Sequence, residues 1–248
     1  MLTLDFDSQD NILFGGNIIS DSKNIPMFGY KLADTGNLRY VKQIITTENA
    51  NSNHIRFVEP ARAIILIMTS DNSYQYFIAD IDVKLGIVVH LFKIDDPSSS
   101  FTYTLSDQLV IEPQLGKAFI SNWVFGQPGI IALSLTSLSD CKTYRYISDN
   151  FTYGVLTSMK VNSQVNAAFQ IGSVCGQNFN GSLLSIINPS TFVVIKALSY
   201  QSKQCNDPLI TDLLLADEKA LTEQKMIIYS QYHNMMNIQY LALNKITY

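Results

Sequence analysis

Short runs of alternating apolar and polar residues, each ended by turn-forming residues, extend along the whole chain. In the first run Leu2, Leu4 and Phe6 alternate with polar residues, which is the period of a strand with one buried face. Three more apolar runs follow up to residue 45, separated by turns that contain Asp, Asn and Gly. The pattern predicts four antiparallel strands in succession, a meander that cannot bury both of its faces alone.

Glycine residues punctuate these runs and predict where strands end. A glycine permits the backbone conformations that tight turns and close approaches require. We therefore expect the following glycines at strand ends or in hairpin turns: Gly15, Gly36, Gly86, Gly116 and Gly129.

The same arrangement recurs along the chain with a period of about 50 residues, which is in the range of propeller blades. The sequence therefore predicts an all-β fold, a β-propeller or an open arc of about five four-stranded antiparallel blades in a single domain. The expected units are residues 1–50, 51–100, 101–150, 151–205 and 206–248.

The last unit contains only three strand-like runs, so its blade is expected to be incomplete. Its third strand, residues 237–243, would then be a sheet edge with free backbone donors and acceptors. We expect this edge, at Ile238, Tyr240 and Ala242, to be covered in trans by a neighbouring subunit or by another fragment of a longer polypeptide. The alternative is an edge that remains in contact with water.

Composition narrows the class of protein. The chain has 248 residues, of which 47% are hydrophobic and 15% charged, and its net charge is −4. This charge offers no electrostatic basis for nucleic-acid binding, and no apolar run reaches the roughly 18 residues of a membrane-spanning helix. The N-terminus lacks the basic and apolar regions of a signal peptide, so either the protein is not secreted or the chain lacks its leader.

No catalytic or metal-binding constellation stands out in the sequence. The histidines His54, His90 and His233 lie in three different units, whereas metal ligands usually converge with some close spacing. The carboxylates near residues 5–10 resemble the start of a calcium loop but lack its central glycine and distal glutamate, which favours an Asx-type turn. We therefore expect no catalytic residue, no metal and no cofactor.

Three cysteines and two glycosylation sequons are the remaining candidate sites. Cys175 and Cys205 are expected on the same edge of the fourth blade and predict a disulfide, with Cys141 on the opposite edge of the third blade; three unpaired thiols are the alternative. Asn150 and Asn180 begin N-x-S/T sequons in expected loops and predict glycosylation.

The first unit resembles the β-propeller repeats of bacterial and protist surface proteins. Those repeats pair a hairpin of the form D-x-x-G-N with a later hairpin of the form K-L-D-x-x-G, and here Asp10 stands in place of the glycine before the asparagine. The composition, rich in Asn, Gln, Ile and Tyr, is also similar to that of ciliate surface and secreted proteins. The matching residues are Asp7, Asn11, Gly15, Lys31, Leu32 and Gly36.

This resemblance implies a scaffold or an adhesive module and not a catalyst. Our leading hypothesis is a non-enzymatic structural protein of a cell surface, extracellular filament or coat, which associates with itself or with other subunits through propeller faces and the open strand edge. The alternative is a propeller module that binds a glycan or a protein, and a propeller hydrolase is a third. The fold alone does not discriminate between them.

Overall fold

A computed structural model shows an all-β chain. Regular structure in its described part consists of strands and one short 3-10 turn. The structure describes residues 3–46, 48–69, 75–94, 109–124, 127–145, 151–162, 166–176, 180–201, 209–216, 224–232 and 235–243.

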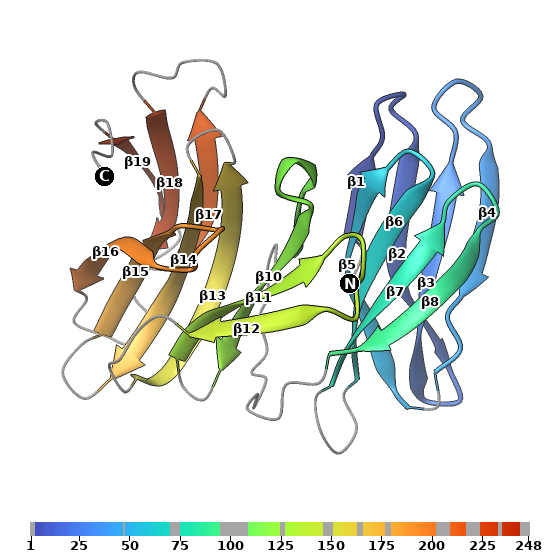
Figure 1. Cartoon of the computed structure of the whole chain (residues 1–248), viewed down its shortest axis with the longest axis horizontal. Coiled ribbons are helices and arrows are strands. Elements are labelled where there is room, and N and C mark those ends of the chain that lie inside the picture. Colours follow the sequence, from blue (N-terminus) through green and yellow to red (C-terminus); the bar gives the residue numbers. More distant parts are fainter. Residues whose placement is uncertain are drawn as a thin grey trace. The chain divides into compact units, whose positions relative to one another are not determined.

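The first sheet is a four-stranded antiparallel meander in the order β1-β2-β3-β4 (Figure 1). Its strands are β1 (Thr3–Phe6), β2 (Ile12–Ser20), β3 (Lys23–Lys31) and β4 (Leu38–Gln43). Polar turns connect consecutive strands, as the alternation of apolar runs and turn residues predicts.

The second sheet repeats this arrangement in the order β5-β6-β7-β8. Its strands are β5 (Ala50–Glu59), β6 (Arg62–Thr69), β7 (Tyr76–Asp82) and β8 (Ile87–Lys93). β6 is almost wholly buried, because both of its faces are covered.

The third sheet has the order β12-β11-β10-β9. It comprises β9 (Leu109–Glu112), β10 (Lys117–Val124), β11 (Gln127–Ser134) and β12 (Cys141–Arg145). The 3-10 turn η1 (Pro113–Leu115) links its first two strands.

The fourth and fifth sheets complete the described part. The fourth has the order β13-β14-β15-β16 and the fifth has three strands, β17-β18-β19. Their strands are β13 (Phe151–Asn162), β14 (Ala167–Gly176), β15 (Asn180–Ile187), β16 (Val194–Gln201), β17 (Leu209–Ala216), β18 (Gln224–Tyr232) and β19 (Met235–Leu243).

These five sheets follow the five units read from the sequence, which confirms the prediction of an all-β chain built from antiparallel meanders. Each sheet falls within one predicted unit, except that β5 begins one residue before the second unit. By its contacts the chain forms two compact units, the first of which comprises Met1–Pro97, Gly116–Phe119 and Ala132–Lys142. The prediction of a single domain stays a prediction.

The best-described core lies in this first compact unit, between the β1–β4 sheet and the β5–β8 sheet. We call this contact the seam. Apolar side chains of both sheets bury one another there, which removes from water the faces that neither meander could cover alone. The buried members of this cluster are Leu13, Phe28, Tyr30, Ile44, Ala50, Ile55, Ala63, Ile65, Ile67, Ala79, Ile81 and Val83.

Side chains of β1 also hydrogen-bond across the seam to the backbone of β5. The amide of Ile55 donates to Thr3 Oγ1 at 3.3 Å, and the amide of Phe57 donates to Asp5 Oδ2 at 2.8 Å. Thr3 and Asp5 are two residues apart, so they lie on the same face of β1. The polar positions of the first alternating run thus belong to the contact between the sheets.

Two of the five glycine predictions are wrong. Gly36, Gly86 and Gly116 do lie in turns with φ between 62° and 66°. Gly15, however, lies inside β2, where a Cβ atom would come within 2.8 Å of Ser52 Oγ, so close approach of the second sheet and not a strand end requires glycine there. Gly129 lies inside β11, where its carbonyl accepts a hydrogen bond from Gln170 Nε2 at 3.2 Å.

Asp10 adopts a backbone conformation that glycine favours. Its φ is 61°, in the left-handed region that glycine adopts without steric cost. Aspartate is among the few other residues that tolerate this conformation. Aspartate is therefore compatible with the turn between β1 and β2.

Candidate functional site

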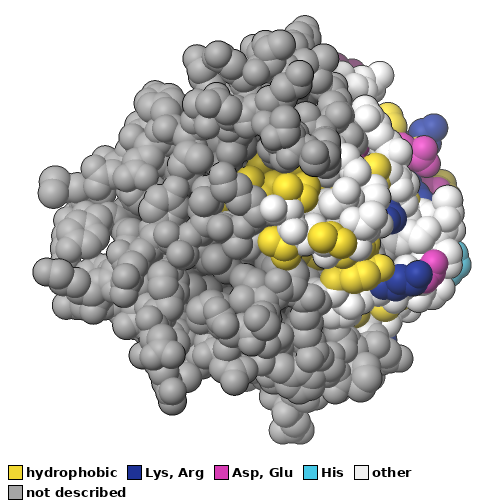
Figure 2. Space-filling view, turned by 60° about the vertical axis from the view of Figure 1, so that its left-hand side comes forward, with side chains coloured by type: hydrophobic (Ala, Val, Ile, Leu, Met, Phe, Trp, Pro, Cys, Tyr) yellow, Lys and Arg dark blue, Asp and Glu magenta, His cyan; other side chains and the backbone are white. Residues whose placement is uncertain are grey.

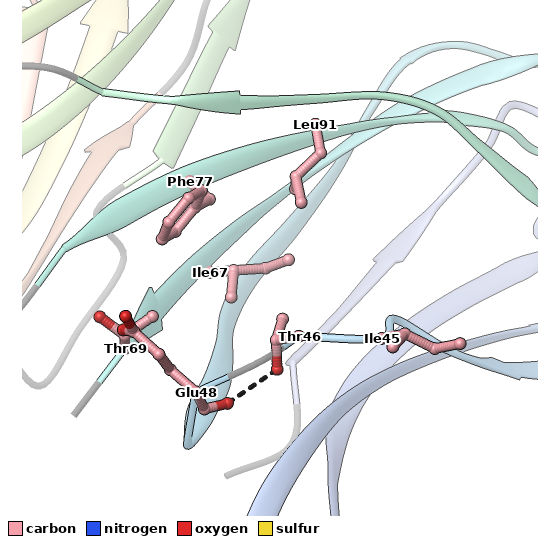
Figure 3. A pocket seen from close by; sticks show the side chains of 7 residues that line it. All are labelled: Ile45, Thr46, Glu48, Ile67, Thr69, Phe77 and Leu91. Atoms are coloured by element: carbon pink, nitrogen blue, oxygen red, sulfur yellow. Dashed lines mark hydrogen bonds between the residues drawn. The ribbon is translucent and has the colours of Figure 1, made fainter. Parts of the chain in front are cut away.

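An apolar pocket opens at one end of the seam (Figure 3). We call it the apolar pocket. Its volume is about 240 Å³, which is smaller than the roughly 300–1,000 Å³ of usual ligand sites. Its lining comes from β6, β7, β8 and the segment that connects β4 to β5. The lining residues are Ile45, Thr46, Glu48, Ile67, Thr69, Phe77 and Leu91.

The register of the second sheet explains why its apolar side chains converge in this pocket. Ile67 pairs with Phe77 across β6 and β7, and Leu91 pairs with Ala79, the next residue but one on the same face of β7. Ile67 is fully buried and belongs to the seam core. The floor of the pocket is therefore continuous with the core, while its mouth is open.

The rim of the pocket combines an exposed apolar side chain with a carboxylate. Ile45 is 90% exposed and Leu91 is 44% exposed. The hydroxyl groups nearby are engaged, because Thr46 Oγ1 donates to the Glu48 carbonyl at 2.9 Å and Thr69 Oγ1 accepts from the amide of Gln75 at 3.1 Å. No described residue hydrogen-bonds to or forms an ion pair with the Glu48 carboxylate, and in Figure 3 this side chain extends toward Thr69.

A second, more polar cavity lies at the opposite end of the seam. We call it the polar cleft; its volume is about 610 Å³. The β1–β2 turn, the β3–β4 turn and the β7–β8 turn all contribute to it. Its lining residues are Asp7, Ser8, Gln9, Asn11, Tyr30, Leu32, Asp34, Arg39, Pro60, Val83 and Lys84.

Asp7 organises the floor of the polar cleft. Its carboxylate accepts hydrogen bonds from the amides of Gln9 (2.9 Å) and Asn11 (3.0 Å), from Asn11 Nδ2 (2.9 Å) and from the Tyr30 hydroxyl (3.2 Å). This confirms an Asx-type turn at Asp7. Burial alone would raise the pKa of Asp7, but the hydrogen bonds from Asn11, Gln9 and Tyr30 outweigh it and lower that pKa.

The pKa of Tyr30 is raised, whereas that of Asp7 is lowered. Burial raises the pKa of its hydroxyl, and the negative charge of Asp7 raises it further. General acid–base catalysis at neutral pH needs a group whose pKa lies near 7, and a tyrosine nucleophile needs a lowered pKa. The pair of Asp7 and Tyr30 therefore has the electrostatics of a structural turn.

Tyr40 closes the seam beside this cleft. Its hydroxyl donates to the Val83 carbonyl at 2.7 Å, and its ring lies 6.0 Å from the ring of Tyr30 and 5.9 Å from that of Phe28. Burial raises the pKa of Tyr40, and the neighbouring Tyr30 raises it further. Gly86 lies against the same ring, since a Cβ atom there would be 2.9 Å from two Tyr40 ring atoms.

The predicted disulfide and glycosylation sites are only partly described. Cys175 lies on β14, whereas Cys205 lies outside the described residues, so their disulfide stays a prediction. Asn150 is also outside the described residues. Asn180 is the first residue of β15 and pairs with Cys175. The prediction that Asn180 lies in a loop is therefore wrong.

The three histidines lie in different parts of the chain. His54 is buried, His90 Nδ1 lies 4.0 Å from Asp80 Oδ2, and His233 falls outside the described residues. Within the described ranges, no group of three or more His, Cys, Asp or Glu side chains converges as metal ligands would.

The edge predicted at Ile238, Tyr240 and Ala242 lies on β19, which ends the strand order of its sheet in the part of the chain that is described. β19 pairs with β18 without a register shift from Leu243 to Met235, and it contains no charged residue. The outermost strands β4, β8 and β16 differ, because each has a register shift and at least one lysine or arginine. Bulges and charges are the usual protection of a sheet edge.

Comparison with known proteins identifies the fold. The sequence matches no protein-family model and no curated protein. The neuraminidase-like protein of A/bat/Guatemala/164/2009 is similar in structure, with 8% identity and a TM-score of 0.60 over 99% of this chain and 72% of that chain. For the subtype N10 neuraminidase-like protein of A/little yellow-shouldered bat/Guatemala/060/2010 the identity is 8% and the TM-score 0.61, over 98% and 80% of the two chains.

Puromycin hydrolase is also similar, with 9% identity and a TM-score of 0.57 over 97% of this chain and 38% of that chain. At such low identity these likenesses show the fold alone. The chain is therefore a propeller-like all-β protein, which is the fold class predicted from the sequence. Among the residues that can be described, no helix has the length and apolarity needed to cross a membrane.

Proposed function

We propose that this protein is a non-enzymatic propeller module that binds other proteins, as a scaffold of a cell surface, extracellular filament or coat. The observation that carries the proposal is the unprotected edge of β19. An uncharged strand of nine residues without a bulge offers its outer backbone groups to an incoming strand. The edges of β4, β8 and β16 carry such protection, so β19 differs from these three described edges.

The electrostatics of the polar cleft support the non-enzymatic part of the proposal. The pKa of Asp7 is lowered and that of Tyr30 is raised, so neither is tuned for proton transfer at neutral pH. The propeller-like fold is compatible with both binding and hydrolysis, so these side chains and not the fold distinguish the two functions.

The association through β19 can be tested by sedimentation velocity. We expect the wild-type chain to form larger species as its concentration rises, and Ile238→Lys to sediment as a single chain because a charge protects the edge. Val41→Lys places a lysine on β4, an edge that already carries Arg39 and Lys42, and should behave as the wild type. A wild-type chain that remains single, with β19 amides that exchange as fast as an open edge, would contradict the proposal.

The extracellular part of the proposal rests on the predicted disulfide and glycans. Intact mass of native material before and after removal of N-glycans should report glycans at Asn150 and Asn180. Thiol labelling without reduction should modify Cys141 alone if Cys175 and Cys205 are joined. Unmodified asparagines together with labelling of all three thiols would place the protein in a reducing compartment.

The polar cleft favours a second function, the binding of a glycan or a polar peptide. It exposes Asp34, Arg39 and Lys84, whose charges of both signs suit hydroxyl and amide groups. A glycan array that shows binding by the wild type and none by Arg39→Ala would support this alternative.

A further inference from the structure

The apolar pocket has the size of a receptor for one side chain and not for a folded surface. Its volume is about 240 Å³, below the range of about 300–1,000 Å³ usual for small-molecule sites. Its apolar lining comes from Ile67, Phe77 and Leu91 on three adjacent strands and from Ile45, whose side chain extends away from these three in Figure 3. A long unbranched side chain could lie along this lining.

Two of the residues that line the pocket, Ile45 and Leu91, are among the exposed large apolar side chains of the described part. Ile45 is 90% exposed although the preceding residue, Ile44, is buried in the seam core. Figure 2 shows hydrophobic side chains of the described part next to one another on one face of the molecule, without assigning them to particular residues. Such groupings mark sites of interaction more often than isolated exposed residues do.

The charge at the rim specifies the occupant. The Glu48 carboxylate lines the pocket, and no residue in the described ranges forms an ion pair with it. Lys93 lies opposite Phe77 in the β7–β8 register, but it does not line the pocket and already has an interaction of its own. A carboxylate beside an apolar cavity is complementary to a cation on an apolar stem.

We propose that the apolar pocket receives one lysine or arginine side chain of a partner protein. The methylene groups of that side chain would pack against Phe77 and Leu91, above the buried Ile67, and its charged head would meet Glu48. The ring of Phe77 adds a face that cations and guanidinium groups favour. This inference rests on the proposed protein-binding role but uses a different part of the molecule from β19.

The test begins with a phage library of random heptapeptides selected against the folded chain. We expect the selected peptides to share a lysine or arginine at one position. Isothermal titration calorimetry should then show that Glu48→Gln weakens a selected peptide about three- to tenfold, as one partly exposed ion pair does. Asp34→Asn, which removes a carboxylate from the polar cleft, is the matched control and should change nothing.

A peptide with norleucine in place of its lysine completes a double-mutant cycle. It should bind the wild type and Glu48→Gln equally weakly, since the stem remains and the charge pair is already lost. A selection without binders, or binders without a cation, would overturn the proposal, and so would a peptide that is insensitive to Glu48→Gln. Sedimentation of Ile238→Lys separates this result from the function proposed for β19, because that variant retains the pocket.

Discussion

The two ends of the seam between the first two sheets are built in opposite ways. At the polar cleft, the Asp7 carboxylate accepts hydrogen bonds from three neighbouring residues, and the Tyr40 hydroxyl bonds the second sheet at Val83. At the apolar pocket, an exposed isoleucine and a carboxylate to which no described residue bonds lie beside a hollow that continues into the core.

This difference separates a region that stabilises the fold from one that is available for binding. Hydrogen bonds and ring contacts at the polar cleft are already satisfied within the chain, so substitutions there should reduce the free energy of unfolding. The groups at the mouth of the apolar pocket contribute little to folding, so substitutions there should affect binding alone. Three substitutions test the contrast, and they are described from the largest expected effect to the smallest.

Gly86→Ala should be the most damaging of these changes. Gly86 has a φ of 66°, and a Cβ atom there would lie 2.9 Å from the Tyr40 ring, so both backbone strain and a clash arise. We expect the free energy of unfolding to fall by about 2–4 kcal/mol. Chemical denaturation followed by circular dichroism would measure the loss.

Gly36→Ala is the matched control for this prediction. Gly36 has the same φ of 66°, but nothing lies within 4 Å of the added Cβ atom. The control should therefore cost only about 1 kcal/mol, the strain of the left-handed conformation. Equal losses for the two variants would show that Tyr40 does not hold this end of the seam rigidly.

Asp7→Ala should have an intermediate effect that depends on pH. The change removes the acceptor of four hydrogen bonds, and we expect a loss of about 1–2 kcal/mol at neutral pH, allowing for its partial exposure. Asp34→Ala is the control, because Asp34 accepts only from the exposed amide of Thr35 at 2.7 Å, and it should cost less than about 0.5 kcal/mol.

The pH dependence follows from the lowered pKa of Asp7 in the folded state. Its contribution should be complete above the unfolded pKa of about 3.9 and should disappear as the pH falls through the lower folded value. The difference in stability between the wild type and Asp7→Ala should thus be constant from neutral pH to about pH 5 and shrink in stronger acid. A difference that grows on acidification would contradict the assignment.

Ile45→Ser should have the smallest effect on stability. Ile45 is 90% exposed, so its removal should change the free energy of unfolding by less than about 0.5 kcal/mol. The same variant should weaken any peptide that occupies the apolar pocket, because it shortens the wall at the mouth. Substantial destabilisation would mean that Ile45 belongs to the folded core and would remove the contrast between the two ends.

Much of the fold could be predicted from the sequence because the signal is local. Alternation in residues 2–6 and the turn residues after each run predict strands and hairpins, and the period of these groups predicts the five sheets. The left-handed turn at Asp10 and the Asx turn at Asp7 are likewise local, since a short side chain bonds the adjacent backbone.

The candidate site could not be predicted in the same way. Ile45, Glu48 and Leu91 have no recognisable motif, and they converge only because two meanders pack together. The error at Gly15 has the same origin, because its close contact, Ser52, is in another sheet. The edge at β19, by contrast, was predicted from the three strand-like runs of the last unit.

The sequence by itself therefore determined the class of fold, the number of sheets and most of the turns, because strand periodicity and turn chemistry depend on neighbours along the chain. Only the tertiary structure decided which faces meet, which hydrogen bonds cross the seam and where a pocket remains. Those features depend on packing between residues that are distant in sequence, and packing is settled by shape and register across sheets and not by any local pattern.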